Sequence, residues 1–456
     1  MMKIAVLGGG QSGLGSAVLA RKEGFEVFLS DSGRLSDQIK ASLQKEGIPF
    51  EEGGHTMDKI LDADEVIKSP GIPETAPVMK EVRKKGIPVI SEIEFGGRYS
   101  KARHICITGS NGKTTTTTLV YELLKAAGLN VGVGGNIGLS YAYQVATCDY
   151  DWYVLELSSF QLDDTFTFRS DVAVLTNITP DHLDRYDYRI ENYVDSKFRI
   201  IRNQRPDDFF IYSVDDALTM KYVCDHQERM TMRSLPFTVK DTLLEGAYID
   251  NGMMNISCNG REFLFDPSRM QIKGRHNIYN AMAAVMAAMI AGVDDDTVTE
   301  VLCSFGGVEH RMEVVDEIGG VLYVNDSKAT NVDSVWYALD SMTRPTVWIA
   351  GGTDKGNDYD TLKELARAKV RTLVCMGLDN DKLVKAFTGV VPFVYSTSSL
   401  DEAMEMVATV THPGDCVLLS PACASFDLFK NYEDRGRRFK ECVRDIEHIK
   451  RRAQER

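Results

Sequence analysis

The sequence predicts an α/β protein with three domains, and three observations support this prediction. The chain has 456 residues, enough for two to four domains with large cores. Short strands rich in Val, Ile and Leu alternate with amphipathic helices, as in parallel α/β sheets. This alternation starts anew three times, without a sequence repeat or a low-complexity linker. We expect domains at residues 1–97, 98–305 and 306–456.

The expected elements follow in chain order. The first domain runs from the strand KIAVLG through EVFLSD and DEVIKSPGIP to PVISEIEF. The second runs from HICITG through WYVLELSS and VAVLTNI to a helix-rich stretch that ends near Val301. The third contains the strands VLYVND, TVWIAGG, TLVCMG and CVLLSP.

The bulk composition excludes several classes of protein. A formal net charge of −14 argues against nucleic acid or an anionic membrane as the main partner. Nine cysteines without a CxxC pair indicate neither a disulfide framework nor a zinc site. The start MMKIAVLGGG enters a strand directly, and the longest apolar-rich run, 278–291, is too short to span a bilayer. We therefore expect a cytoplasmic protein.

A dinucleotide-type glycine pattern follows the first strand. Gly8, Gly10 and Gly13 spell G-x-G-x-x-G, and Asp31 ends the next strand. Taken alone, this pattern favours an NAD-dependent dehydrogenase. It fits equally a site for another pyrophosphate, such as that of a UDP-sugar, or a turn that only needs tight helix packing.

A second glycine-rich turn, ITGSNGKT, lies between a short buried strand and a helix. The usual P-loop spacing requires a glycine at position 107, which is isoleucine. Nevertheless Gly109 and Gly112 allow backbone N–H groups to converge on an anion, Lys113 adds a charge, and Thr114 offers Mg²⁺ a hydroxyl. The turn therefore favours a nucleotide phosphate site over an ordinary turn with a surface lysine.

Two polar residues follow at the ends of neighbouring strands. Glu156 interrupts the apolar strand of YVLELSSFQL, where a metal would offset the cost of a buried carboxylate. The alternative is a structural acid paired with a base. His182 lies on the loop after VAVLTNI, at the carboxyl end of a strand, where α/β proteins place ligands. A single loop histidine is otherwise unremarkable in function.

Lys197 is the most informative residue of the second domain. In a helix over residues 189–201 it falls on the apolar stripe of Ile190, Tyr193, Val194 and Ile201. Burial would lower the pKa of this lysine and leave a free amine. That amine could act as a nucleophile, remain an ion-paired cation, or combine with CO₂ to form a metal-binding carbamate. In the alternative, the stem is packed and the ammonium reaches water.

Further polar residues lie in the second half of the chain. Asn277 and Asn280, one turn apart in a helix start, either present amides to a nucleobase or cap the helix. In the third domain, strand ends carry residues that we expect to form a polar mouth at one sheet edge, the alternative for each one alone being a solvated loop. These are Asp326, Lys328, Thr330, Lys355, Ser425 and Phe426, with Arg311 at the domain junction.

Taken together, these motifs resemble the Mur ligases. The resemblance covers all three domains through GSNGKT, ELSSFQL, DHLDRY, GRHNIYNAMAA, EHRME, NDSKATN, GGTDKG and SPACASFD. It implies a Rossmann-like UDP-substrate-binding domain, a P-loop-type central ATPase and a Rossmann-like C-terminal domain for the incoming amino acid. NDSKATN and SPACASFD are similar to the member that adds D-glutamate to UDP-N-acetylmuramoyl-L-alanine in peptidoglycan precursor synthesis. GSNGKT and GRHN also fit the sister ligases and folylpolyglutamate synthetase.

The resemblance also implies a role for each candidate residue. The substrate carboxylate would be phosphorylated by ATP, and the acyl phosphate would then be attacked by the amine. Lys113, His182 and Lys197 would be catalytic, with two Mg²⁺ ions held by Thr114 and Glu156 and by His182 and carbamylated Lys197. ATP would contact Gly109, Ser110, Asn111, Gly112, Lys113, Thr114, Thr115, Asn277, Asn280, Arg311 and Asp326. The UDP-muramoyl substrate would contact Ser12, Ser32, Asn136 and Gln161, and D-glutamate would contact Lys328, Thr330, Lys355, Ser425 and Phe426.

The sequence departs from the family at one place, and rival functions remain. Members often carry Thr-Arg after the acid that ends the second strand, whereas this chain reads Asp31-Ser32-Gly33-Arg34, which leaves the uracil-side contacts open. The rivals are a sister ligase, a kinase-like or regulatory nucleotide-binding protein, and a dehydrogenase, which gives Lys113, Glu156 and Lys197 no role. We expect a monomer that binds neither nucleic acid nor membrane.

Overall fold

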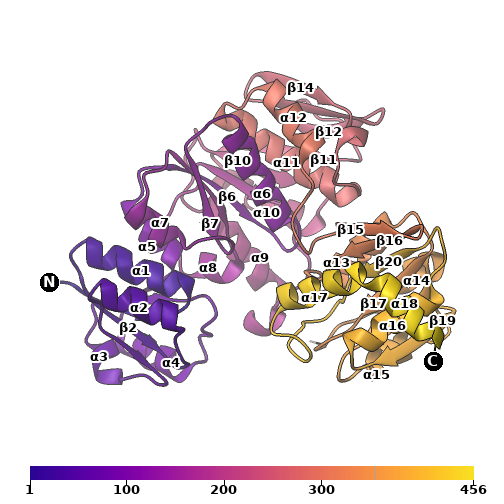
Figure 1. Ribbon diagram of the computed structural model, residues 1–456. Coiled ribbons are helices and arrows are strands. Elements are labelled where there is room, and N and C mark those ends of the chain that lie inside the picture. Colours follow the sequence, from indigo (N-terminus) through magenta and orange to yellow (C-terminus); the bar gives the residue numbers. More distant parts are fainter. Residues whose placement is uncertain (355, 456) are drawn as a thin grey trace. The chain divides into compact units, whose positions relative to one another are not determined.

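The computed structural model describes residues 1–354 and 356–455, which form two compact units. The first contains Met1–Arg269 and Tyr279–Cys303, and the second contains Met270–Ile278 and the chain from Ser304 onward. Two sheets lie in the first unit and one in the second, each accompanied by helices (Figure 1). The expected α/β class is confirmed. The expected boundaries after residues 97 and 305 stay predictions.

The N-terminal sheet is fully parallel, with strand order β3-β2-β1-β4-β5. Side chains of a strand alternate between faces, so Ile4 and Val6 of β1 enter one core while Ala5 and Leu7 enter the other. The strands are β1 (Lys3–Leu7), β2 (Glu26–Asp31), β3 (Phe50–Glu52), β4 (Glu65–Lys68) and β5 (Val89–Ile90). The helices are α1 (Gln11–Lys22), α2 (Asp37–Lys45), α3 (Met57–Leu61), α4 (Pro77–Lys85) and α5 (Glu92–Tyr99).

A buried glutamate, Glu94, connects helix α5 to residues 166–168 of the same unit. The Glu94 carboxylate accepts hydrogen bonds from three consecutive backbone N–H groups, those of Phe166, Thr167 and Phe168, at 2.9 to 3.0 Å. The Thr167 hydroxyl donates to it as well, at 2.5 Å. A carboxylate that satisfies three otherwise unpaired backbone donors is costly to remove.

The central sheet has nine strands in the order β14-β13-β12-β11-β10-β9-β6-β8-β7. All pairs from β7 to β12 are parallel, and the last two strands are antiparallel. Its strands are β6 (Arg103–Thr108), β7 (Val131–Gly135), β8 (Trp152–Glu156), β9 (Val172–Leu175), β10 (Phe209–Ser213), β11 (Arg233–Thr238), β12 (Gly246–Asp250), β13 (Met253–Cys258) and β14 (Arg261–Phe265).

The expectation of a helix-rich stretch up to Val301 is therefore wrong in part, because β10 to β14 lie there. The last three strands form two hairpins whose turns are Asn251-Gly252 and Asn259-Gly260. All four turn residues have positive φ, between 49° and 80°. Asn-Gly at both central positions is the preferred chemistry of a two-residue hairpin turn, so the local sequence explains this part of the sheet.

Helices surround the central sheet and include one that is apolar on all sides. Helix α11 (Arg275–Ala291) is buried throughout its middle, where every residue from 281 to 289 is at most 2% exposed. Such a helix belongs in a core rather than at a surface. The other helical segments are α6 (Lys113–Ala126), α7 (Tyr141–Thr147), α8 (Ser159–Asp163), η1 (Leu183–Arg185), α9 (Ile190–Phe198), η2 (Arg199–Ile201), α10 (Ala217–Asp225), η3 (Gln227–Arg229), η4 (Pro267–Arg269) and α12 (Asp295–Ser304).

The second unit contains a six-stranded sheet in the order β15-β16-β20-β17-β18-β19, parallel except for β15. Its strands are β15 (Glu313–Ile318), β16 (Val321–Asn325), β17 (Thr346–Ala350), β18 (Val370–Met376), β19 (Phe393–Thr397) and β20 (Cys416–Leu419). Its helical segments are α13 (Val332–Ser341), η5 (Asp360–Leu362), α14 (Lys363–Lys369), α15 (Asp381–Phe387), α16 (Leu400–Val410), α17 (Tyr432–Arg444) and α18 (Ile446–Glu455).

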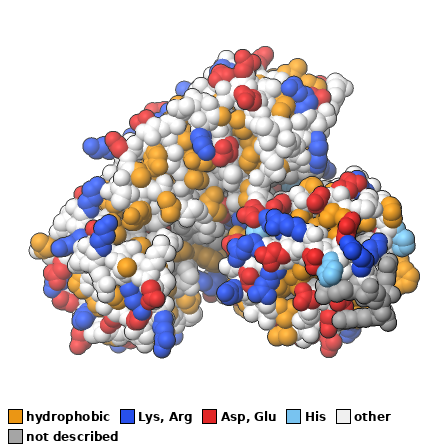
Figure 2. Space-filling view, in the orientation of Figure 1, with side chains coloured by type: hydrophobic (Ala, Val, Ile, Leu, Met, Phe, Trp, Pro, Cys, Tyr) orange, Lys and Arg blue, Asp and Glu red, His pale blue; other side chains and the backbone are white. Residues whose placement is uncertain are grey.

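Both faces of this sheet are covered. One core joins the sheet to α13, α14 and α15, and the other joins it to α16, α17 and α18. The latter three helices lie together on the near side of the sheet in Figure 1. Figure 2 shows basic and acidic side chains interspersed over the surface of this unit. Within residues 1–354 and 356–455, none of the helices is both long and apolar enough to cross a membrane.

Candidate active site

The turn between β6 and α6 has the backbone of an anion-binding loop. Gly109 has φ 145° and Gly112 has φ 84°, backbone conformations that residues other than glycine rarely adopt. A Cβ on Gly109 would lie 1.9 Å from Thr176 Oγ1, and one on Gly112 would lie 2.3 Å from Asn280 Oδ1. Gly112 also precedes α6 without a side-chain cap, so the amino end of a 14-residue helix faces the loop.

The segment after the neighbouring strand β9 holds this loop in shape. Asn177 accepts from the backbone N–H of Ser110 through its carbonyl, at 2.8 Å, and from that of Asn111 through Oδ1, at 3.0 Å. Thr176 Oγ1 donates to the Asn111 carbonyl at 2.6 Å. Sequence reasoning missed Asn177. The signal was available, because an amide at the carboxyl end of a strand adjacent to β6 lies beside the loop.

Two lysines meet at this loop. Lys113 Nζ donates to the carbonyls of Gly109 and Ser110, at 2.7 and 2.8 Å. Lys197 Nζ, from α9, donates to the same Gly109 carbonyl at 2.7 Å and lies 4.5 Å from the centre of the Tyr193 ring. The inward direction expected for Lys197 is thus present, since its side chain is only 1% exposed.

The environment of Lys197 favours the neutral amine. Burial, followed by repulsion from the Lys113 ammonium, holds the pKa of Lys197 well below its usual value. The carboxylates of Asp181, Asp163 and Glu156 act in the opposite direction and do not compensate. An uncharged amine is the form that can react with CO₂, whereas the ammonium has no lone pair to offer.

Glu156 brings a carboxylate to the end of β8, beside β6. Its side chain is 1% exposed, and Oε1 accepts from Asn136 Nδ2 at 2.8 Å. The other oxygen, Oε2, is buried and has no hydrogen-bond partner among the described residues. A buried acceptor without a partner costs about 1–3 kcal/mol, so a bound cation would offset this cost. Thr114, buried in the first turn of α6, offers a hydroxyl.

His182 lies on the loop that follows β9, in a left-handed backbone conformation with φ 52°. Its Nε2 is 3.7 Å from Asp181 Oδ2, and its ring makes an edge contact with Phe160 at 5.2 Å between centroids. The side chain is 42% exposed, which leaves it accessible to a ligand. Asp181, which sequence reasoning did not select, adds a negative charge to this loop.

The two asparagines of α11 differ in their contacts. Asn280 Oδ1 accepts from Thr116 Oγ1 at 3.3 Å and lies against Gly112, so this amide packs against the glycine-rich turn. Asn277 Nδ2 donates to the Lys273 carbonyl at 2.8 Å, a contact within its own helix start. Both side chains are buried, at 5% and 6% exposure.

The acid of the dinucleotide pattern, Asp31, accepts hydrogen bonds from the protein's own backbone. Asp31 Oδ2 accepts from Gly9 N at 2.5 Å, and Oδ1 accepts from Gly33 N at 2.7 Å. Leu35 closes over the same glycine, because a Cβ on Gly9 would lie 2.0 Å from Leu35 Cδ2. An acid engaged by two backbone donors is not presented to a ribose, which argues against the dehydrogenase interpretation. Gly13 packs tightly, since a Cβ there would lie 1.8 Å from the Gly8 carbonyl oxygen.

The residues expected to bind the UDP-muramoyl substrate all lie in the first unit. Ser12 is half-buried on α1, and Ser32 is exposed just after β2. Asn136 is engaged by Glu156 through its amide nitrogen. Gln161 forms a capping box with Ser158 at the start of α8, where its Oε1 accepts from the Ser158 backbone N–H at 3.0 Å. Gln161 therefore has a structural role at the start of α8, and its expected contact with the substrate stays a prediction.

In the second unit the expected nucleotide residues form a buried group. Asp326 accepts from the Ser420 hydroxyl at 2.8 Å and from the Met312 N–H at 3.2 Å. Burial raises the pKa of Asp326 to about 6, against the opposing charge of Arg311. Arg311 Nε is itself buried without a hydrogen-bond partner in the described part of the chain.

The residues expected to bind the amino acid follow the ends of β16 and β20. The Lys328 ammonium lies 5.5 Å from the centre of the Tyr432 ring, and Thr330 N donates to the Lys328 carbonyl at 3.0 Å. Ser425 is buried, whereas Phe426 is 71% exposed. Lys355 lies outside the described residues.

Comparison with known proteins identifies the family. The chain matches the models of the Mur ligase middle domain over residues 107–288, the Mur ligase glutamate ligase domain over 310–423 and the MurD N-terminal domain over 3–78. The UDP-N-acetylmuramoylalanine--D-glutamate ligase of Christiangramia forsetii is 52% identical over 446 residues, covering 97% of this chain and 99% of that protein. The enzyme of the same name from Bacteroides fragilis is 49% identical over 447 residues, covering 98% and 100%.

Solved structures with low sequence identity share the fold. The UDP-N-acetylmuramate-alanine ligase MurC of Thermotoga maritima aligns with a TM-score of 0.62 at 20% identity, covering 98% of this chain and all of that one. A pseudomurein peptide ligase type C of Methanothermus fervidus aligns with a TM-score of 0.60, also at 20% identity, covering 97% and 100%. The family models match segments from each of the three sheets, and the relatives are about half identical over nearly the whole length. The chain therefore belongs to the Mur ligase family.

Proposed function

We propose that this chain is an ATP-dependent ligase that joins D-glutamate to UDP-N-acetylmuramoyl-L-alanine in peptidoglycan precursor synthesis. The observation that carries the proposal is the 52% identity over 97% of the chain to a protein with that name. The meeting of Lys113, Glu156 and Lys197 around one glycine-rich loop supports it, because phosphoryl transfer needs a cationic side chain beside the phosphates and ligands for a metal ion. A dehydrogenase would leave this loop without a task.

The proposed reaction has two steps. The carboxylate of UDP-N-acetylmuramoyl-L-alanine attacks the γ-phosphorus of ATP, which gives an acyl phosphate and releases ADP. The amine of D-glutamate then attacks the acyl carbon, and inorganic phosphate leaves as the amide forms and the nitrogen loses its proton. The first step is needed because a carboxylate is a poor electrophile and has no adequate leaving group.

The residues of the loop bind and orient the nucleotide. Backbone N–H groups of the 109–112 turn and the amino end of α6 receive the phosphate oxygens. Lys113, which rests on two loop carbonyls, exchanges them for the phosphates when the nucleotide enters. Asn280 holds one edge of the loop against Thr116.

The donor groups fit two Mg²⁺ ions. Thr114 and Glu156 would hold one, and the unpartnered Oε2 of Glu156 is an oxygen ligand of the kind that Mg²⁺ prefers. His182 and carbamylated Lys197 would hold the other, although an imidazole nitrogen is the less typical ligand for this ion. When bound, the ions would neutralise charge on the transferred phosphoryl group.

Carbamylation supplies the missing oxygen ligands at Lys197. The Nζ lone pair attacks the carbon of CO₂, an N–C bond forms, one C=O pair moves onto oxygen, and a proton leaves the nitrogen. The neutral amine that burial favours is the form that reacts. The product carries a negative charge close to the Lys113 ammonium, where the unmodified amine faces repulsion.

The amino-acid specificity is tested by product formation. Purified protein is incubated with ATP, Mg²⁺, UDP-N-acetylmuramoyl-L-alanine and one amino acid from a panel of D-glutamate, L-glutamate, L-alanine and meso-diaminopimelate. We expect phosphate release and a product heavier by one glutamyl residue only with D-glutamate. Preference for another amino acid would identify a sister ligase, and phosphate release without any amino acid would exclude ligation. A folate with L-glutamate serves as the control for a folylpolyglutamate synthetase-like activity.

The acyl phosphate is tested with an isotope. Substrate labelled with ¹⁸O in its carboxylate should transfer one ¹⁸O atom to the inorganic phosphate, because the carboxylate oxygen becomes the bridging oxygen and leaves with phosphorus. Unlabelled phosphate would contradict this route. The monomeric state and the cytoplasmic location stay predictions, and light scattering of the purified protein checks the first.

A further inference from the structure

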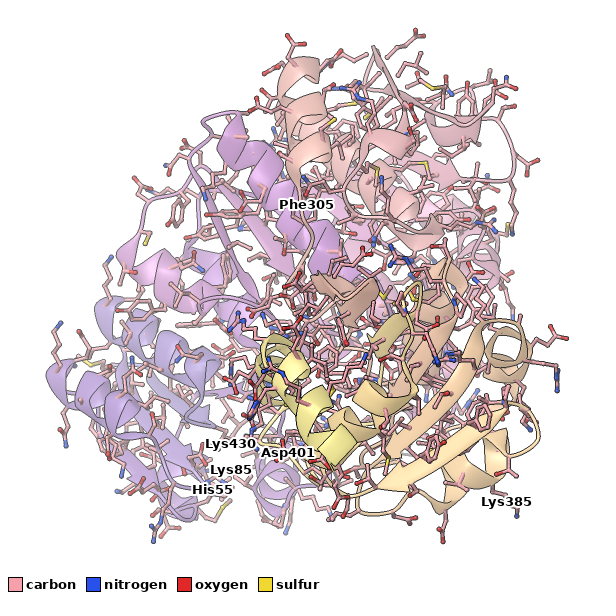
Figure 3. The ribbon with its side chains drawn as sticks, turned by 45° about the vertical axis from the view of Figure 1, so that its right-hand side comes forward. His55, Lys85, Phe305, Lys385, Asp401 and Lys430 are labelled. Carbon is pink, nitrogen blue, oxygen red and sulfur yellow. The ribbon has the colours of Figure 1, made fainter. Side chains whose placement is uncertain are left out.

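The second unit contains a buried arginine that is hydrogen-bonded to no carboxylate among the described residues. Arg435 lies in the second turn of α17, and its side chain is only 1% exposed. Its neighbours Arg437 and Arg438 on the same helix are exposed. Figure 3 labels Lys430, which lies in the segment leading into α17. None of the residues assigned so far to the reaction lies on this helix.

The guanidinium of Arg435 connects three separate segments of the unit. Nε donates to Ser327 Oγ at 3.0 Å, and Nη2 donates to the Ser327 carbonyl at 2.9 Å. Nη1 and Nη2 make longer hydrogen bonds to the Cys423 carbonyl, both at 3.3 Å, and Nη1 makes one to the Gly351 carbonyl at 3.4 Å. These acceptors follow β16, β20 and β17, three adjacent strands at the centre of the sheet.

The arrangement is expensive, and the cost requires an explanation. All five hydrogen bonds go to neutral oxygens, so among the described residues no carboxylate is hydrogen-bonded to this cation. Removing a charge from water is unfavourable, and only good hydrogen-bond geometry offsets this penalty. Burial lowers the pKa of Arg435 to about 10, so the charge persists at neutral pH.

The three segments lead directly into the residues proposed to bind the amino acid. Ser327 is followed by Lys328 and Thr330, and Cys423 is two residues before Ser425. Gly351 directly follows β17, and the candidate Lys355 comes later in the chain, outside the described residues. One planar side chain therefore sets the spacing of three loops. A guanidinium can do this because its N–H donors are held in a fixed geometry, whereas an ammonium lacks such a geometry.

We infer that Arg435 is a positioning residue for the amino-acid substrate: its guanidinium fixes the loops after β16, β17 and β20 in the geometry that receives the carboxylates of glutamate. This inference rests on the proposed function. The charge of the guanidinium is partly balanced by Asp427 and Asp326, which act against the lowering of its pKa by burial.

Three variants distinguish the positioning effect of the guanidinium from the effect of its charge. Arg435→Lys keeps the charge and loses the fork, Arg435→Met removes both, and Arg437→Met is the matched control on the exposed side of the same helix. We measure kcat and the KM for D-glutamate, ATP and the UDP-substrate, together with the thermal midpoint of each variant. ADP formation in a single turnover without amino acid isolates the first step of the reaction.

A positioning role predicts a selective change. Arg435→Lys should raise the KM for D-glutamate at least about tenfold, since hydrogen bonds from a charged donor are lost, and Arg435→Met should raise it further. The KM for ATP, the single-turnover ADP formation and all parameters of Arg437→Met should stay within about threefold of the wild type. An unchanged KM for D-glutamate in Arg435→Lys, or an equal rise of all three KM values, would overturn the inference and leave Arg435 as a structural brace.

A milder variant keeps the test informative if Arg435→Met does not fold. Ser327→Ala removes the Nε acceptor and the hydroxyl that donates to the Tyr432 carbonyl at 2.8 Å, while Arg435 stays in place. It should raise the KM for D-glutamate several-fold, and a wild-type value would count against the inference. Failure of the proposed function is seen separately, as wild-type protein that forms no product with D-glutamate. The KM comparison is then made with the amino acid that the wild type does use.

Discussion

Replacing Gly112 by alanine tests whether the glycine-rich turn is a nucleotide site. The new Cβ would lie 2.3 Å from Asn280 Oδ1, and the residue would keep a φ of 84°. The left-handed conformation costs about 1–2 kcal/mol for a residue with a side chain. The overlap is relieved by turning the Asn280 amide away, which loses its buried hydrogen bond from Thr116, at about 0.5–1.5 kcal/mol more.

Gly128, at the other end of the same helix, provides the matched control. Its φ is 75°, and a Cβ there meets nothing within 4 Å. Gly128→Ala therefore carries the backbone strain alone, whereas Gly112→Ala carries the strain and the displaced amide. We expect Gly112→Ala to melt several degrees below Gly128→Ala, at about 2–4 °C per kcal/mol for a unit of this size.

The two variants should differ more in nucleotide binding than in stability. Titration of each with a non-hydrolysable ATP analogue should show at least about a tenfold weaker affinity for Gly112→Ala, because the displaced amide intrudes on the loop, and wild-type affinity for Gly128→Ala. Equal affinities and equal melting temperatures for the two variants would refute the assignment of this turn as the phosphate site.

Three further predictions concern buried ionisable groups. Lys197→Ala should reduce phosphate release by at least about a hundredfold, since it removes the carbamate site, and millimolar acetate or formate should restore part of it; full activity in the variant would contradict the role. Burial alone would raise the pKa of Glu94, but hydrogen bonds from the Thr167 hydroxyl and the backbone of 166–168 lower it below its usual value. The pKa of Glu94 is thus lower in the folded state than in the unfolded state, so Glu94 stabilises the fold above about pH 4.5, and this contribution is lost as the pH falls. Glu94→Gln should therefore lower the melting temperature at pH 7 by several degrees. It should also make the melting temperature less dependent on pH in the acid range. Burial raises the pKa of Asp326 to about 6 from an unfolded value near 4, so the protonated carboxyl stabilises the fold below pH 4 and the stability declines as the pH rises from about 4 to 6. Asp326→Asn should remove this decline in melting curves recorded across that pH range. An unchanged dependence of the melting temperature on pH would contradict this prediction.

Local pattern was sufficient for much of the fold and of the central site. The strand before the glycine-rich turn, the helix after it and the inward direction of Lys197 all follow from apolar periodicity, which reflects burial directly. The strands β10 to β14 were not predicted, although the two hairpin turns that join the last three strands are Asn-Gly pairs, a local signal for a hairpin.

Other features depend on partners that are distant in sequence and cannot be predicted from a single segment. Arg435 stands in YEDRGRRFKE, where four basic residues follow one another within six positions and the pattern resembles a solvent-exposed face. Its burial depends on carbonyl groups from residues 327, 351 and 423. In the same way, the occupation of Asp31 by two backbone donors became visible only when the turn around Gly9 and Gly33 was placed in space.

The Gly109 carbonyl is shared by two lysines, and this has a consequence for how mutants of either one are interpreted. In the proposed mechanism Lys113 contacts the phosphates, and repulsion from its ammonium also lowers the pKa of Lys197. Removing Lys113 would therefore leave its neighbour more basic and slower to capture CO₂, so a defect in that variant would combine a lost phosphate contact with a poorly modified partner. The two positions should behave as one unit, with a double substitution less harmful than the product of the single ones.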